Sequence, residues 1–203
     1  MFERIGKKIG KSLFAIALVI ATPLSTAAWD LVPFDTGTTQ IGQINALMAP
    51  IAPLVGRDDG SNTLINQSGT NNFSTASIAG NGSLTLLQQA GSNNRAVQAV
   101  VGQGSALMLL QGGSNNNVLQ ASQGDRNFQY VGVSGRNNDL AYIQVGNDLM
   151  GALDVTNSTN TTVLAIQTPG SNNYMMPSGL SGANDKLVIV VPGRMYVLDK
   201  NKL

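Results

Sequence analysis

The sequence predicts an all-β protein, a β-solenoid of about five 22-residue laps, each made of two strand-turn units. Glycine recurs every eleven residues, a small polar residue usually follows three positions later, and the seven residues between turns carry apolar side chains at spacings of two. The glycines in phase are Gly69, Gly80, Gly91, Gly102, Gly113, Gly124, Gly135 and Gly146, and Asn157 continues the series. Each unit is therefore a four-residue turn followed by a strand.

The glycine is position one of the turn, where positive φ is tolerated, and position four is a polar side chain. Position four is occupied by Ser61, Asn72, Ser83, Asn94, Ser105, Asn116, Asn127, Asn138 and Asn160, and in one unit by the apolar Leu149. An eleven-residue period also occurs in some right-handed coiled coils. Glycine in a helix interior costs about 1 kcal/mol relative to alanine, so a helix interrupted at every period is excluded.

Alternate units differ, and this doubles the period to 22 residues. Units that open with serine carry Gln67, Gln89 and Gln111 six positions later, whereas the intervening units carry Ile78 and Val100 there. Two strands and two turns therefore make one lap. A lap cannot bury its own inner face, so successive laps must stack with like residues above like.

The segment Ser83-x5-Gln89-x-Gly91-x2-Asn94-x-Ala96 resembles the curlin repeat of the curli fibre subunits of bacterial biofilms. The resemblance covers residues 61 to 167 and has departures: Val100, Val118, Val133 and Val155 stand where the repeat has glutamine or alanine. It implies an amyloid-forming solenoid with cross-β stacking, exported across the inner membrane, secreted through the outer membrane and assembled at the cell surface. The implied partners are other curlin subunits and outer-membrane secretion and assembly proteins. The segment from Gly135 to Gly146, "GRNNDLAYIQVG", is more similar to the minor, nucleating subunit than to the major one.

The resemblance also places position four on the inner face, together with positions six, eight and ten. Amide side chains stacked in columns can donate to one neighbour and accept from the other, each bond contributing about 1 kcal/mol. The predicted stacking residues are Ser61, Gln67, Asn72, Ser83, Gln89, Asn94, Ser105, Gln111, Asn116, Asn127, Asn138, Gln144 and Asn160. The outer face then carries Leu84, Leu86, Val97, Val101, Met108 and Leu110, an apolar surface that predicts lateral packing between fibres.

Four segments are expected along the chain. Residues 1–28 have a basic start, an apolar stretch and small residues near Ala28, typical of a cleaved signal peptide; the apolar run is too short for a membrane anchor. Residues 29–59 lack the period and contain three prolines, which predicts a linker or targeting segment. Residues 60–167 form the solenoid, and residues 168–203 form degenerate turns and a tail.

The tail has two interpretations. Leu187 to Val191 predicts an edge strand that caps the stack, because an uncovered sheet edge templates aggregation. Its bases, Lys186, Arg194, Lys200 and Lys202, also suit an anchor for an accessory protein. Cap and anchor remain compatible.

The composition excludes most kinds of catalytic and metal-binding site. The chain has no cysteine and no histidine, and Asp125, Asp139, Asp148 and Asp154 do not recur in phase, so no catalytic, cofactor or metal site and no small-molecule substrate is predicted. Removal of residues 1–28 leaves 10 acids against 8 bases, a net charge of −2 that argues against nucleic acid.

Four function classes follow from the sequence: a nucleating or anchoring minor subunit of a curli-type fibre, a self-polymerising major subunit, a non-fibrous ice-binding or adhesive solenoid, and, last, an enzyme. An ice-binding surface needs flat ranks of threonine, and only Thr156, Thr161 and Thr162 come near one.

Overall fold

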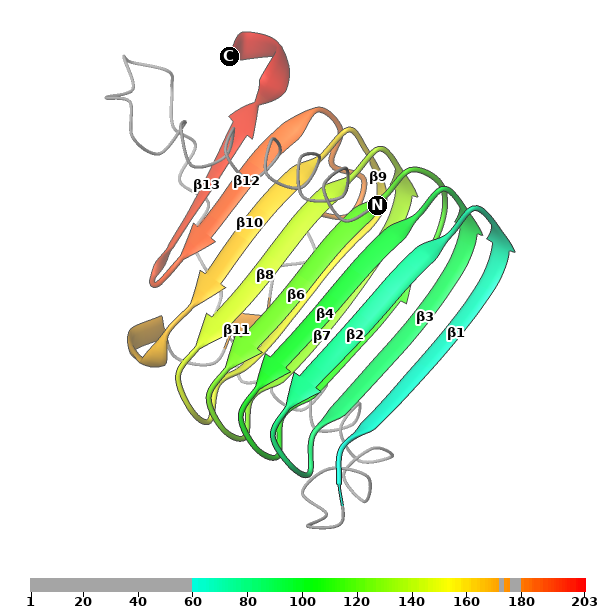
Figure 1. Cartoon of the computed structure of the whole chain (residues 1–203). Helices are drawn as coiled ribbons and strands as arrows, with labels where there is room; N and C mark the ends of the chain where they lie inside the picture. Colours follow the sequence, from blue (N-terminus) through cyan, green and yellow to red (C-terminus); the bar gives the residue numbers. More distant parts are fainter. Residues whose placement is uncertain (1–59, 172–173, 176–179) are drawn as a thin grey trace, which may run out of the picture.

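The computed structural model describes residues 60–171, 174–175 and 180–203. The expected signal peptide (1–28) and linker (29–59) lie outside the described residues. The described chain is a β-solenoid of about five laps, in which the backbone winds repeatedly between two facing sheets (Figure 1). The predicted fold class is confirmed.

Odd-numbered and even-numbered strands form separate sheets. The six-stranded odd sheet contains, in order, β1 (Asn62–Thr70), β3 (Leu84–Ser92), β5 (Ala106–Gln111), β7 (Phe128–Arg136), β9 (Met150–Thr159) and β11 (Tyr174–Met175). The seven-stranded even sheet contains, in order, β13 (Arg194–Asp199), β12 (Lys186–Val191), β10 (Thr162–Gln167), β8 (Asp139–Val145), β6 (Asn117–Gln123), β4 (Arg95–Val101) and β2 (Phe73–Ala79). Two short 3-10 helices, η2 (Pro169–Ser171) and η4 (Lys200–Lys202), follow β10 and β13.

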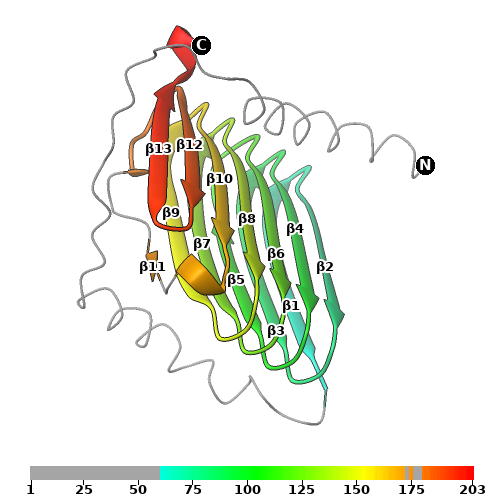
Figure 2. The same cartoon turned by 90° about the vertical axis from the view of Figure 1, so that its left-hand side faces the viewer.

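Stacking is parallel and in register. Leu87 of β3 pairs with Leu109 of β5, and Gln98 of β4 pairs with Gln120 of β6, so equivalent residues of successive laps lie side by side. Figure 2 looks toward the C-terminal end of the stack, with β13 and β12 in front and the earlier laps one behind another. Among the strands from β1 through β12, each pairs in parallel with its equivalent one lap away, and no two of these strands that are neighbours in sequence form a hairpin.

The core lies between the two sheets. Leu87, Leu109, Val131 and Leu153 form an apolar column with no exposed surface, and Ala96 and Val118 face it from the even sheet. Position four also lies inside, as the resemblance implied: Ser83, Asn94, Ser105 and Asn116 are all buried. Gln88, which has the opposite parity in the same strand as Gln89, is exposed. This parity fixes which glutamines belong to the inner columns.

The outer faces of the two sheets differ, which the sequence did not indicate. Strands β4 and β6 alternate between buried and partly exposed residues, whereas β3, β5 and β7 are largely buried on both faces. Leu84, Ala106, Met108 and Phe128 form a second apolar cluster on the outer face of the odd sheet. Val101 and Leu110 remain exposed, as expected for an outer face. The expectation that Leu84 and Met108 are free for lateral packing is therefore wrong: both are buried within this cluster.

The eleven-residue register is broken earlier than the sequence suggested, by one inserted residue in β9. Val133 pairs with Val155, but Gly135 pairs with Ser158, so β9 contains a bulge. Ser158, and not Asn157, therefore continues the glycine column. The assignment of Asn160 to position four is wrong for the same reason: Thr161 occupies that place, and its N–H donates to Asn138 Oδ1 at 3.0 Å.

The C-terminal end of the stack is closed by a hairpin. Strand β12 adds in parallel to β10, and β13 turns back to pair antiparallel with β12. The predicted strand from Leu187 to Val191 is present as β12, but β13 forms the sheet edge outside it. Val188, Val190 and Met195 bury their side chains against the end of the core. None of the described segments is a helix with the length and apolar character needed to cross a membrane.

Candidate functional site

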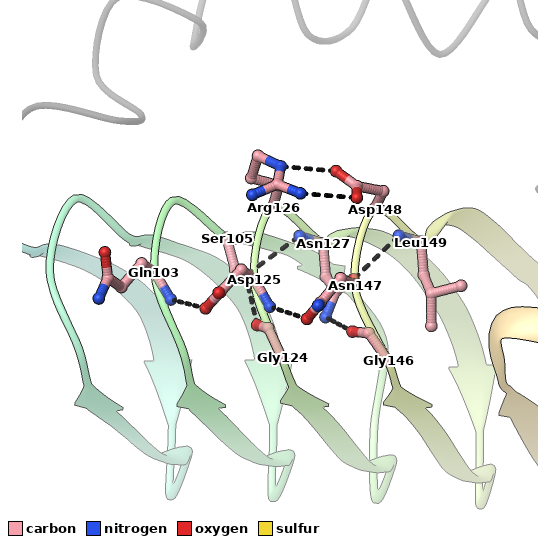
Figure 3. Close-up of polar contacts among 10 residues, drawn as sticks. All are labelled: Gln103, Ser105, Gly124, Asp125, Arg126, Asn127, Gly146, Asn147, Asp148 and Leu149. Atoms are coloured by element: carbon pink, nitrogen blue, oxygen red, sulfur yellow. Dashed lines mark hydrogen bonds and ion pairs between the residues drawn. The ribbon is translucent and has the colours of Figure 1, made fainter.

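The residues at position four join the turns of successive laps by hydrogen bonds. Asn127 N–H donates to Ser105 Oγ in the lap before at 3.1 Å, and its Nδ2 donates to the carbonyl oxygen of Gly146 in the lap after at 2.7 Å (Figure 3). Asn127 Oδ1 in turn accepts from Leu149 N–H. One side chain thus satisfies backbone groups of two laps, because an amide carries both donors and acceptors.

The same arrangement repeats in the other turn. Asn72 Oδ1 accepts from Asn94 N–H, Asn94 Oδ1 accepts from Asn116 N–H, and Asn116 Oδ1 accepts from Asn138 N–H, each at 3.1 Å. The asparagine columns were expected to hold together mainly by bonds from amide to amide. Most of their bonds instead join a side chain to the backbone of the next lap. They specify the turn spacing as well as the side-chain register.

The glycine column is a consequence of lap stacking. Gly91 and Gly113 have φ of 112° and 88°, in a region that side chains rarely adopt. A Cβ on Gly91 would also collide with the carbonyl oxygen of Gly113, and one on Gly113 with the carbonyl oxygen of Gly135. Turn position one therefore requires glycine for two reasons, backbone conformation and the approach of the next lap.

Turn position three, which the sequence analysis did not single out, is also left-handed. Asn93, Asn115 and Asn137 have φ of 55° to 57°, and Arg126 and Asp148 occupy the equivalent place with 55° and 58°. Asparagine tolerates this conformation best among residues with a side chain. The doublet Asn-Asn in "GSNN" therefore has two separate tasks: the first residue forms the turn, and the second bonds the laps.

Amide side chains form true ladders in the strands. Gln67 Nε2 donates to Gln89 Oε1 at 2.6 Å, and Gln89 Nε2 donates to Gln111 Oε1 at 2.7 Å. Gln111 Nε2 ends the ladder on the carbonyl oxygen of Asn116 at 2.7 Å, because Val133 stands in the next lap. The three residues of the predicted column are thus brought together.

Two further ladders lie in the even sheet. Gln98 Nε2 donates to Gln120 Oε1 at 2.8 Å, and this pair was not predicted as a ladder although its inward parity could have revealed it. Gln144 Nε2 donates to Gln167 Oε1 at 2.7 Å, across the shifted register. Within the described residues, the Oε1 atoms of Gln98, Gln129 and Gln144 accept no hydrogen bond. Each of these buried oxygens stands where the preceding lap has a different residue type, Ala76, Leu107 or Ser122.

Three of the four aspartates that the sequence excludes as a recurrent site make separate contacts in turns or strands. Asp125 Oδ1 accepts from Gln103 N–H, Asp139 Oδ1 accepts from Asn117 Nδ2, and Asp148 forms a two-point ion pair with Arg126 (Figure 3). The hydrogen bond from Arg126 lowers the pKa of Asp148, although both side chains are well exposed. Burial raises the pKa of Asp154 on the outer face. No three metal-ligating side chains gather anywhere in the part of the chain that the structure describes.

Two of the four basic tail residues hold the tail in place, Lys186 within the hairpin and Lys200 against the laps. Lys186 Nζ lies 3.2 Å from Asp199 Oδ2 and joins the strands of the hairpin, and Lys200 Nζ donates to the carbonyl oxygen of Asn160 at 2.7 Å. The backbone N–H of Asn201 and the hydrogen bond from Lys186 lower the pKa of Asp199. Arg194 and Lys202 are exposed. The basic residues therefore divide into a pair that fixes the hairpin and a pair that faces outward.

The geometry defines the class of the protein: a parallel β-solenoid with two strands in each lap, held by amide ladders and a glycine column. Among the described residues, the edge of β1 is exposed along its whole length, whereas the β12–β13 hairpin closes the other end of the stack. Comparison of the chain with models of protein families, with curated proteins and with solved structures gives no match.

The ladder leads to a prediction about single glutamines. Gln89→Ala should lower the free energy of unfolding by about 1 to 3 kcal/mol, because Gln67 and Gln111 each lose a buried partner. Gln88→Ala, in the same strand with the side chain exposed, should change it by less than about 0.5 kcal/mol. Urea denaturation followed by circular dichroism measures both values. Equal losses in the two variants would show that the ladder contributes no stability of its own.

Proposed function

We propose that the chain is a structural subunit of an extracellular curli-type functional amyloid fibre, in the minor role that nucleates or anchors the fibre. The observation that carries the proposal is the stacking of laps in register through continuous glutamine and asparagine columns, from Gln67 to Gln111 and from Asn72 to Asn138. Such a column is extended by any further lap with the same residues, which is the physical basis of cross-β growth.

The minor role is supported by the places where the columns stop. Val133 and Val155 replace glutamine in the odd sheet, and Thr161 replaces asparagine at position four. A subunit that polymerises by itself needs matching columns at both of its ends. This chain has long columns in its first laps and interrupted ones in its last.

The proposal includes export and cell-surface assembly, with major curlin subunits and outer-membrane assembly proteins as partners and no enzymatic activity. Two rivals have less support. Thr161 and Thr162 are buried, which disfavours an ice-binding threonine rank, and Asp125, Asp139 and Asp148 serve separate turn and strand contacts, which disfavours catalysis.

A seeding experiment tests the proposal. The secreted form of the chain is incubated alone, and at low molar ratio with a purified major curlin, while thioflavin T fluorescence and fibre morphology are followed. We expect the lag phase of the major curlin to shorten, with few fibres formed by the chain alone. Gly113→Ala, which disturbs the stack without altering the ladder residues, should seed less well.

Abundant fibres from the chain alone without any seeding would instead identify a major subunit. If the chain forms no fibres and does not seed the major curlin, a role in a curli-type fibre is refuted.

A further inference from the structure

We infer that the two ends of the solenoid are unequal, and that the first lap (residues 61–82) is the surface on which the next fibre subunit stacks. The occupant is the last lap of another 22-residue solenoid whose inner columns carry serine, glutamine and asparagine. This inference rests on the proposed function and adds the direction of assembly to it.

The core column is open at the first lap and closed at the last. Ile65 continues the column of Leu87 and Leu109, yet it is 38% exposed whereas the other two are fully buried. Every residue of β1 is exposed. At the opposite end, Leu180, Val188 and Met195 cover the core and are themselves buried. Among the described residues, the first lap is therefore the end of the stack that presents its apolar interior to an incoming subunit.

The first lap also presents unpaired backbone. Asn62 N–H donates to Ser83 O in the second lap at 2.9 Å. Because backbone groups of alternate residues face opposite sides of a parallel strand, those of Thr63, Ile65 and Gln67 face away from the stack. In each later turn, the N–H of position four donates to a side-chain oxygen of the lap before, as Asn94 does to Asn72. Asn72 belongs to the first lap, so no preceding lap among the described residues offers its N–H such a partner.

The side chains specify which partner fits. Gln67 donates its Nε2 to Gln89, and its Oε1 accepts no hydrogen bond within the described residues. A preceding lap with glutamine at the same position would donate to that oxygen, as Gln89 donates to Gln111. A serine or an asparagine at position four would accept from Asn72 N–H. The first lap is therefore complementary to a lap with unbroken columns.

A second copy of this chain does not offer that lap. In its odd sheet the last paired residue of the glutamine column is Val155, and its even sheet ends with the antiparallel strand β13. The even sheet also extends two strands beyond β10, whereas the odd sheet has only the two-residue β11 beyond β9. Since these edges do not match the first lap, the occupant is a different solenoid chain.

In the part of the chain that the structure describes, the charged residues that protect a sheet edge from pairing lie at the C-terminal end of the stack. Natural proteins blunt exposed sheet edges with charged residues or proline. The tail has Arg194, Asp199, Lys200 and Lys202 beside its edge strand, whereas residues 61–82 contain no charged residue and no proline. An unprotected edge of this kind is a template for strand addition.

End-blocking tests the inference. The chain has no cysteine, so Asn62→Cys and Asn201→Cys each provide a single site for a biotin label, one at each end of the stack. Both residues are exposed. Each labelled chain is mixed with a purified major curlin at low molar ratio, with and without streptavidin, and the lag time of thioflavin T fluorescence is measured. Without streptavidin, both labelled chains should seed like the parent, which shows that they fold.

Streptavidin on Asn62→Cys should reduce seeding by about tenfold, because it obstructs the edge of β1, and on Asn201→Cys it should change seeding by less than about twofold. Loss of seeding only with the C-terminal block, or equal effects of the two blocks, would overturn the inference and leave the proposed function standing. Absence of seeding by the unblocked parent chain would refute the proposed function, and the inference would fall with it.

Discussion

Gly113→Ala is expected to lower the free energy of unfolding by about 4 kcal/mol, more than most single substitutions, because two penalties act together. The residue has a φ of 88°, and its Cβ would meet the carbonyl oxygen of Gly135 in the next lap. The added methyl group therefore separates the laps on which position four and the ladders depend. Urea denaturation followed by circular dichroism measures the loss.

Gly104→Asn is the matched control. Gly104 also has positive φ, at 60°, but the nearest atom to its Cβ position is Arg126 Cγ at 3.7 Å, an ordinary contact. Asn115 occupies the equivalent place in a neighbouring turn with a φ of 56°. The control should change the free energy of unfolding by less than about 1 kcal/mol. A similar loss in both variants would show that backbone conformation alone, and not lap contact, requires the glycine column.

Val188→Asp is expected to detach the closing hairpin and to raise the rate of self-association roughly tenfold, because it uncovers the edge of β10. Val188 is fully buried in the core cluster and pairs in register with Val163, so a carboxylate there lies among apolar side chains. Light scattering during storage and sedimentation of the soluble fraction measure the association.

Arg194→Asp introduces the same carboxylate into the same hairpin at an exposed position and should leave the association rate unchanged. If Val188→Asp stays as soluble as the parent, β12 and β13 do not protect the stack. If the two variants aggregate equally, the effect arises from charge and not from opening the end.

The period, the number of strands in a lap and the inward parity could all be predicted, because solenoid stacking repeats the same constraint in every lap. The turn and ladder positions can be recognised because the same residue types recur 22 residues away, as they do for Gly91, Asn94 and Gln89. A constraint that recurs in every lap can be recognised in a single sequence, because successive laps can be aligned with one another.

Features that occur once were not predictable in this way. The bulge in β9 depends on a single inserted residue between Val155 and Ser158, and the Asn-rich sequence around it offered Asn157 and Asn160 as false continuations of the series. The Gln98 and Gln120 ladder was overlooked because the same column carries Ala76 and Tyr142 in other laps. Burial of Leu84 and Met108 on the outer face arises from packing between laps, for which no local pattern exists.

The amide ladders give the molecule a dipole moment along the stack that does not depend on its formal charges. Gln67, Gln89, Gln98 and Gln144 all donate toward the C-terminal end, so their side-chain dipoles add along the stack instead of cancelling. An amide dipole is about 3.5 D, and strand dipoles in a sheet contribute little beside it. A fibre built by repetition of such laps would be a permanent dipole along its axis, with carbonyl oxygens leading at one tip and amide hydrogens at the other. Its filaments should then orient in an applied electric field even at the pH where their net charge is zero.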